Sequence, residues 1–185
     1  MGIKMWLFLV KAIYLFIPAA LANMMPVVVR KHFKFLEVSV DFGAKFRGKR
    51  VFGDHKTLRG FVFGILTAII IVGLQTYLHR FEFFQKISFI NYSEYNFLLL
   101  GFLIGFGVLF GDAVESFFKR QRGIAPGKSW MPWDQLDLVI GGIAFISLYW
   151  MPPWELIVFT IIAAPLLHIG INLAGYYLGI KKNKL

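Results

Sequence analysis

The chain has 185 residues, of which 58% are hydrophobic, a mean hydropathy of +0.66 and a formal net charge of +10. Only 16% of the residues are charged, against roughly 25% in soluble domains, so the composition excludes a soluble globular protein and predicts an integral membrane protein. The sequence contains no cysteine, which excludes a disulfide framework, a thiolate nucleophile and Cys-ligated zinc.

Five apolar segments follow one another along the chain, each close to the roughly 20 residues that a helix needs to cross a bilayer. They cover approximately residues 5–25, 61–78, 97–111, 136–150 and 156–178. We therefore expect an all-α protein in which residues 1–185 form one polytopic membrane domain with five transmembrane helices.

Lysine and arginine are distributed unevenly between the two sides of this predicted bundle. Sixteen of the 20 lie in residues 30–59, 113–135 and 181–185, and four lie on the other side. The positive-inside rule then places the N-terminus outside and the C-terminus in the cytoplasm. We expect a multi-pass protein of the cell membrane whose charged loops share the cytoplasmic face. This topology accounts for the net charge without a nucleic-acid partner.

Four glycines recur in the third apolar segment, with small-xxx-small spacing between Gly101 and Gly105 and between Gly107 and Gly111. This spacing is typical of helices that pack closely in membranes. We interpret it as packing rather than as a direct functional role.

Three acids flank the connection between the third and fourth apolar segments. Asp112 directly follows the third segment, whereas Asp134 and Asp137 share one face at the start of the next helix. Carboxylates on two neighbouring helix ends predict a Mg²⁺ site, because Mg²⁺ prefers hard oxygen ligands. The alternative is that Asp134 and Asp137 only cap their helix. Glu115 is expected to pair with Lys119, four residues later on the same helix.

Basic and small polar residues surround these acids in sequence. Ser116, Lys119 and Arg120 continue the helical face of Asp112 and precede the Pro126-Gly127 turn. Upstream, Gly53 to Gly60 bracket Lys56, Thr57 and Arg59, a composition suited to binding phosphate oxygens. Other polar residues in or next to apolar segments are open to simple hydrogen-bonding interpretations: Asn23, His168 and Asn172.

The motif S-x2-K-R…P-G-x6-D-x2-D, from Ser116 to Asp137, resembles the signature of membrane CDP-diacylglycerol synthases. The K-T-x-x-G element from Lys56 to Gly60 matches a second element of that family. Gly111-Asp112-x3-Ser116 and Asn23-x2-Pro26 are more similar to the archaeal branch, the CDP-archaeol synthases.

The resemblance implies CTP- and Mg²⁺-dependent cytidylyl transfer to an isoprenoid lipid phosphate, 2,3-bis-geranylgeranylglycerol 1-phosphate, with release of pyrophosphate. It implies a catalytic set of Asp112, Asp134, Asp137, Lys119 and Arg120, in which the three acids hold the metal. It also implies a substrate-binding set of Asn23, Lys56, Thr57, Arg59, Ser116, Pro126 and Gly127. The oligomeric state stays open, a homodimer included.

Three other functions are less consistent with the sequence. A CDP-alcohol phosphotransferase would carry the pattern D-G-x2-A-R-x8-G-x3-D-x3-D, which the sequence lacks. A non-enzymatic, lipid-binding membrane scaffold would retain its function after Asp112→Asn. His168 and Asn172 are too few polar groups within a predicted span to indicate a transporter.

Overall fold

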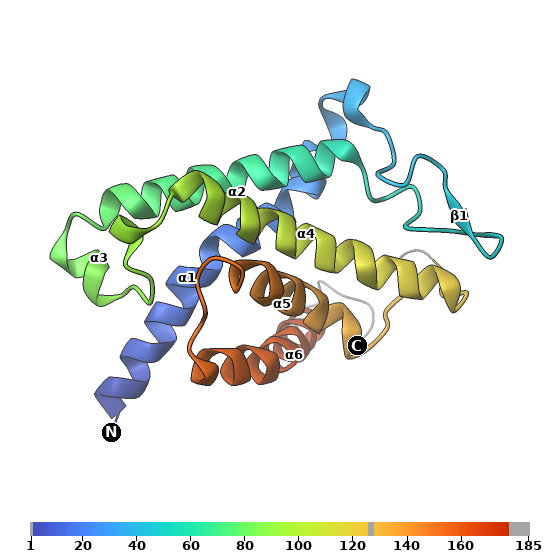
Figure 1. The fold of residues 1–185 in the computed structure, drawn as a ribbon. Helices are drawn as coiled ribbons and strands as arrows, with labels where there is room; N and C mark the ends of the chain where they lie inside the picture. Colours follow the sequence, from blue (N-terminus) through green and yellow to red (C-terminus); the bar gives the residue numbers. More distant parts are fainter. Residues whose placement is uncertain (1, 126–127, 178–185) are drawn as a thin grey trace.

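The structure, a computed structural model, describes residues 2–125 and 128–177 as a bundle of helices (Figure 1). Five long helices account for most of it: α1 (Gly2–Val28), α2 (Leu58–Leu78), α4 (Phe97–Gln121), α5 (Trp133–Ile146) and α6 (Trp154–Tyr177). The connections contain α3 (Glu82–Lys86), the 3-10 helices η1 (Val29–Lys31), η2 (Lys34–Leu36) and η3 (Tyr92–Glu94), and an antiparallel hairpin of β1 (Lys45–Phe46) and β2 (Lys49–Arg50). Each apolar segment of the sequence thus falls on a helix.

Within the described residues, three segments are long and apolar enough to cross a membrane: Lys4–Lys31, α2 and α4. The helix α5 has 14 residues. Its length is therefore about 21 Å, less than the roughly 30 Å of a bilayer's hydrocarbon core. The mainly helical architecture agrees with the sequence.

The central helix is α4, which packs on α2 along one face and on α5 along another. Gly101 and Gly105 face α2, whereas Gly107 and Gly111 face α5. A Cβ atom at Gly111 would overlap the backbone carbonyl of Asp137, so a larger residue could not occupy this position without moving a helix. The packing interpretation of the glycines is confirmed.

A buried core lies toward the α3 end of the bundle, away from the acids of α4. Tyr92 and Ile90 are almost fully buried there, together with Val72 of α2. The Tyr92 hydroxyl donates to Gln75 Oε1 at 2.9 Å, and Gln75 Nε2 donates to the Tyr14 carbonyl at 2.6 Å. This core holds α1 and α2 together at the end opposite the charged loops.

The two charged connections meet at the other end of the molecule, where α4 ends, α5 begins and the β1–β2 hairpin lies (Figure 1). Lys49 Nζ of the hairpin donates to the carbonyl of Gln121 at 2.7 Å. Gln121 Nε2 in turn donates to the Arg50 carbonyl at 3.4 Å. Segments that are 71 or 72 residues apart in sequence therefore form one polar end.

Asp41 organises the loop that carries the hairpin. Its carboxylate accepts hydrogen bonds from the Arg50 side chain and from the backbone N–H groups of Gly43, Phe52 and Gly53. Burial opposes ionisation of this carboxyl, but these hydrogen bonds outweigh burial and hold the pKa of Asp41 well below its usual value. The ionised Asp41 therefore stabilises the loop.

Candidate active site

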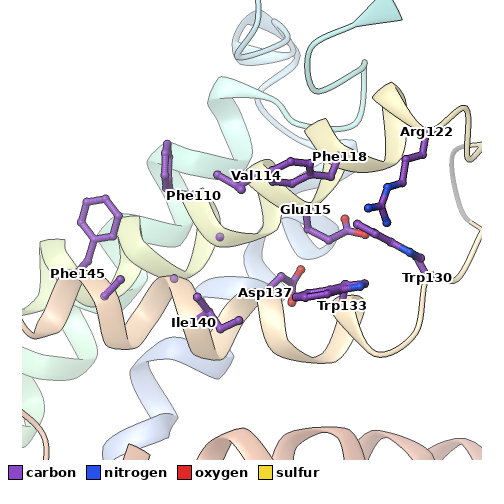
Figure 2. A pocket seen from close by; sticks show the side chains of 13 residues that line it. Phe110, Val114, Glu115, Phe118, Arg122, Trp130, Trp133, Asp137, Ile140 and Phe145 are labelled. Carbon is purple, nitrogen blue, oxygen red and sulfur yellow. The ribbon is translucent and has the colours of Figure 1, made fainter.

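Three carboxylates from two helices converge at the polar end of the α4–α5 interface. Asp112 and Glu115 lie one turn apart on α4, and Asp137 comes from the first turns of α5. One oxygen of each lies within 4.8 Å of the others. The close approach at Gly111 brings Asp137 to α4, and Glu115 and Asp137 project into the same space between the helices (Figure 2).

Lysines neutralise two of these three acids. Lys56 Nζ lies 2.6 Å from Asp112 Oδ2, and Lys119 Nζ lies 2.8 Å from Glu115 Oε1. Within residues 2–125 and 128–177, no cationic side chain forms an ion pair with Asp137. The group therefore contains three carboxyl groups that offer hard oxygen donors, and only two of them have a lysine partner in the described part of the chain. This donor set fits a divalent cation such as Mg²⁺.

Asp134 does not belong to this group of three acids. The group therefore differs by one residue from the predicted metal-binding set of Asp112, Asp134 and Asp137. Its Oδ1 lies 2.7 Å from Lys119 Nζ, and its Oδ2 accepts the backbone N–H of Trp130 at 2.9 Å. Asp134 is not the N-cap of α5 either, because Pro132 occupies that position. In this structure Asp134 joins the end of α4 to the turn before α5.

Glu115, which was not among the predicted metal ligands, lies with Asp112 and Asp137 in this group. Its expected ion pair with Lys119 is present, yet the same carboxylate also faces Asp112 and Asp137. The i, i+3 spacing from Asp112 was the signal that could have identified it, because residues three apart share a helix face.

The residues upstream of α2 separate into two groups. Lys56 reaches Asp112, and Thr57 is the N-cap of α2, with its hydroxyl accepting the Gly60 N–H at 3.2 Å. The side chain of Arg59 is only 4% exposed and is paired elsewhere, with the His32 carbonyl at 2.8 Å and Glu37 at 3.4 Å. The structure therefore does not bring Arg59 to the carboxylates; Arg59 holds the segment after α1 against α2.

Arg120 and Ser116 lie on α4 near the acids. Arg120 is half-buried, and its Cδ comes within 3.9 Å of a Cβ added at Gly53 in the hairpin loop, whereas Ser116 is buried one turn after Asp112. Asn23 is half-buried on α1. Several further predicted positions lie outside the described residues: Pro126, Gly127, and the side chains of His168 and Asn172.

An apolar pocket of about 440 Å³ opens between α4 and α5, directly beside the carboxylates (Figure 2). Phe110, Val114, Phe118, Ile140 and Phe145 form much of its wall. Glu115 and Asp137 also line it, and Trp130, Trp133 and Arg122 lie at its polar end. The arrangement places acids that could hold a metal next to a space suited to a hydrocarbon chain.

Comparisons with known proteins identify one family. Residues 5–184 match the model of a family described as CarS-like: CDP-archaeol synthase. A CDP-archaeol synthase of Methanospirillum hungatei is 36% identical over 86% of this chain and 98% of its own length. One from Archaeoglobus fulgidus is 34% identical over 94% of this chain and 96% of its own length.

A solved structure described as an intramembrane enzyme for archaeal membrane lipids biosynthesis has a similar fold. It superimposes with a TM-score of 0.62 at 29% identity, covering 88% of this chain and 92% of that chain. The resemblance inferred from the motifs is confirmed by these matches.

Proposed function

This chain belongs to the CarS-like CDP-archaeol synthase family, and from that premise we propose that the group formed by Asp112, Glu115 and Asp137 is its Mg²⁺-dependent active centre. The protein is a CTP-dependent cytidylyltransferase that forms CDP-archaeol. The observation that supports our assignment of the site is that the three acids and the apolar pocket share two residues, Glu115 and Asp137.

The three acids supply hard oxygen ligands from two helices, and Asp137 has no lysine partner in the described part of the chain. When bound there, Mg²⁺ would supply neutralisation of the phosphate charge during transfer. Asp134 then acts indirectly, by holding Lys119 and the backbone of Trp130.

The reaction is a substitution at phosphorus. A phosphate monoester has a second pKa of about 6 and is mostly dianionic at pH 7, so no general base is needed. An oxygen of the lipid phosphate attacks the α-phosphorus of CTP, the bond to the β-phosphate oxygen breaks, and pyrophosphate leaves with that electron pair. Catalysis of this kind depends on positioning and charge stabilisation.

Lysine and arginine side chains of this chain provide the positive charge. Lys56 and Lys119 already lie at the acids, and Arg120 lies beside the hairpin loop. We assign these three to the triphosphate, because each stands where the basic loop meets α4. Arg59 belongs to the support of this loop, since its partners are His32 and Glu37.

The pocket between α4 and α5 is the proposed place of the isoprenoid chain of the lipid phosphate. Its aromatic and aliphatic wall allows the chain to remain in an apolar environment while the phosphate meets the acids. We further propose five membrane spans with the N-terminus outside, which puts this site at the cytoplasmic face of the cell membrane.

Purified protein incubated with labelled CTP, Mg²⁺ and a panel of lipid phosphates tests the proposal. We expect release of pyrophosphate and formation of a CDP-lipid with the unsaturated isoprenoid diether phosphate, both abolished by a chelator. No product with any isoprenoid lipid phosphate would contradict the proposal.

A matched pair of variants tests the acid group itself. Glu115→Gln and Glu82→Gln each remove one member of an i, i+4 ion pair with lysine, at 2.8 and 2.7 Å. We expect Glu115→Gln to lose at least about 100-fold in kcat, since it removes a proposed metal ligand. Glu82→Gln, on α3 at the opposite end, should retain normal turnover. Equal rates in both variants would remove Glu115 from the site.

A further inference from the structure

We propose that Arg122, stacked on Trp130, binds the phosphate of the lipid substrate at the polar end of the pocket between α4 and α5. This inference rests on the proposed function and adds to it a residue that the motifs do not contain. The Arg122 guanidinium lies 4.6 Å from the centre of the Trp130 ring, within the range of a cation–π contact. Figure 2 shows the two side chains together at this end of the pocket.

The position of Arg122 suits a substrate with an apolar chain and an anionic head. Among the described residues that line the pocket, Arg122 is the cationic one, and Figure 2 shows it at the same end as Glu115 and Trp130, with Phe110 and Phe145 at the other end. A lipid whose chain occupies the apolar part would place its phosphate near both the acids and Arg122. The metal that the acids would hold and the guanidinium would then face the same phosphate group.

The neighbouring lysines are held at the acids, where they are assigned to the triphosphate, whereas no acid of the described residues holds Arg122. Lys56 pairs with Asp112, and Lys119 pairs with both Glu115 and Asp134. In the described part of the chain, Arg122 forms no ion pair with an acid. A planar guanidinium stacked on an indole still presents its N–H edge, which matches two oxygens of one phosphate.

The stack is anchored at both ends. Arg122 is the C-cap of α4, and its backbone N–H donates to the Phe118 carbonyl at 3.0 Å. The Trp130 backbone N–H donates to Asp134, which is held by Lys119. Asp134 is accordingly a positioning residue: it fixes the turn on which Trp130 presents its ring to Arg122.

The geometry favours the lipid phosphate over CTP as the partner of Arg122. Residues two apart on a helix point away from each other, and Arg120 lies beside Gly53 of the basic loop. Arg122 instead lines the apolar pocket. The two arginines at the end of α4 thus face different parts of the site: Arg120 faces the basic loop and Arg122 faces the apolar pocket. A phosphate bound by Arg122 is therefore the one attached to the hydrocarbon chain of the lipid.

Steady-state kinetics of Arg122→Gln, Arg122→Lys and Trp130→Leu, with both substrates varied, test this role. We expect Arg122→Gln to raise the KM for the lipid phosphate by roughly 10- to 100-fold and to leave the KM for CTP unchanged. Arg122→Lys should recover part of the loss, because the charge remains but the planar stack is gone. Trp130→Leu should raise the same KM by a smaller factor. The matched control is Arg80→Gln, which removes a cation–π contact with Tyr77 of 5.0 Å at the far end of the molecule and should change neither KM.

A binding measurement without CTP provides a second readout. The tryptophan fluorescence of the protein is followed during titration with the isoprenoid diether phosphate and with the corresponding neutral diether alcohol. Arg122→Gln should weaken binding of the phosphate but not of the alcohol.

An unchanged lipid KM in Arg122→Gln, or a rise in the CTP KM alone, would overturn the inference. Equal weakening for phosphate and alcohol would do so too, because it would indicate a structural role. Absence of turnover in the unmodified protein would instead contradict the proposed function, and the binding titration would still test Arg122.

Discussion

Replacing Gly111 by alanine tests the link between helix packing and catalysis. A Cβ atom at this position would overlap the carbonyl oxygen of Asp137 and would lie 3.0 Å from its carbonyl carbon and 3.1 Å from the Gly141 Cα. These are backbone atoms, which cannot rotate away as a side chain can. The helices α4 and α5 must therefore separate by about 1 Å to restore normal carbon contacts.

The expected losses follow from this displacement. Overpacking of this kind costs about 1–3 kcal/mol of stability. A displacement of about 1 Å between reacting groups can lower the rate by about 100-fold, which corresponds to about 2.7 kcal/mol in activation free energy. Asp137 moves with α5 and Asp112 with α4, so the three carboxylate oxygens, now within 4.8 Å of one another, would spread apart.

The assay is kcat in the CTP-dependent reaction, together with thermal unfolding in the same detergent. Gly101→Ala is the matched control, because its added Cβ would meet the α2 backbone at 2.6 Å, far along α4 from the acids. We expect both variants to lose stability but only Gly111→Ala to lose about 100-fold in kcat. Normal kcat in a folded Gly111→Ala protein would refute the dependence of the acid group on this contact.

Two further predictions concern single acids. Asp137→Asn should abolish turnover, because it removes a proposed ligand, whereas Asp134→Asn should retain about 1–10% of kcat, as expected for a residue that orients others; equal kcat values in the two variants would contradict the distinction. The second prediction concerns Asp41, whose pKa is lower in the folded loop than in the unfolded chain. Its contribution to loop stability is therefore fully present above the unfolded-chain pKa of about 4 and is lost as the pH falls from there towards the lower folded-state pKa. We expect acidification below about pH 4 to loosen the hairpin loop. Limited proteolysis or hydrogen exchange of the loop should show this pH dependence in the unmodified protein. The control Asp54→Asn, which changes a side chain that is 81% exposed, should show it too. Asp41→Asn should not show it, because its loop should already be looser at pH 7.

The helices could be predicted from the sequence because each apolar segment satisfies its own backbone hydrogen bonds. The length of the apolar segments therefore predicted α1, α2, α4, α5 and α6 without knowledge of their neighbours. The acids Asp112 and Asp137 were also identifiable, since charges beside such segments are costly to keep. The motifs around them were sufficient to recognise the family.

Three-dimensional contacts decided which acids meet. Asp134 and Asp137 are both acids near the start of α5 and share a predicted face, yet Lys119 holds Asp134 while the contact at Gly111 brings Asp137 to α4. The sequence predicted only an ion pair between Glu115 and Lys119, which is present. The proximity of Glu115 to Asp137 depends on the packing of α5 against α4 and could not be predicted from the sequence. The sequence predicted Arg59 as a phosphate ligand, but its buried side chain contacts Glu37 and the His32 carbonyl.

The sequence by itself determined the helices, the membrane environment and the chemistry class, because these depend on local hydrophobicity and on residue types within short motifs. Only the tertiary structure decided the membership of the acid group and the place of Arg122 at an apolar pocket. The sequence alone does not distinguish a carboxylate that pairs with a lysine from one that joins a metal site. The choice between them depends on distances of a few ångströms between helices, and those distances are set by packing.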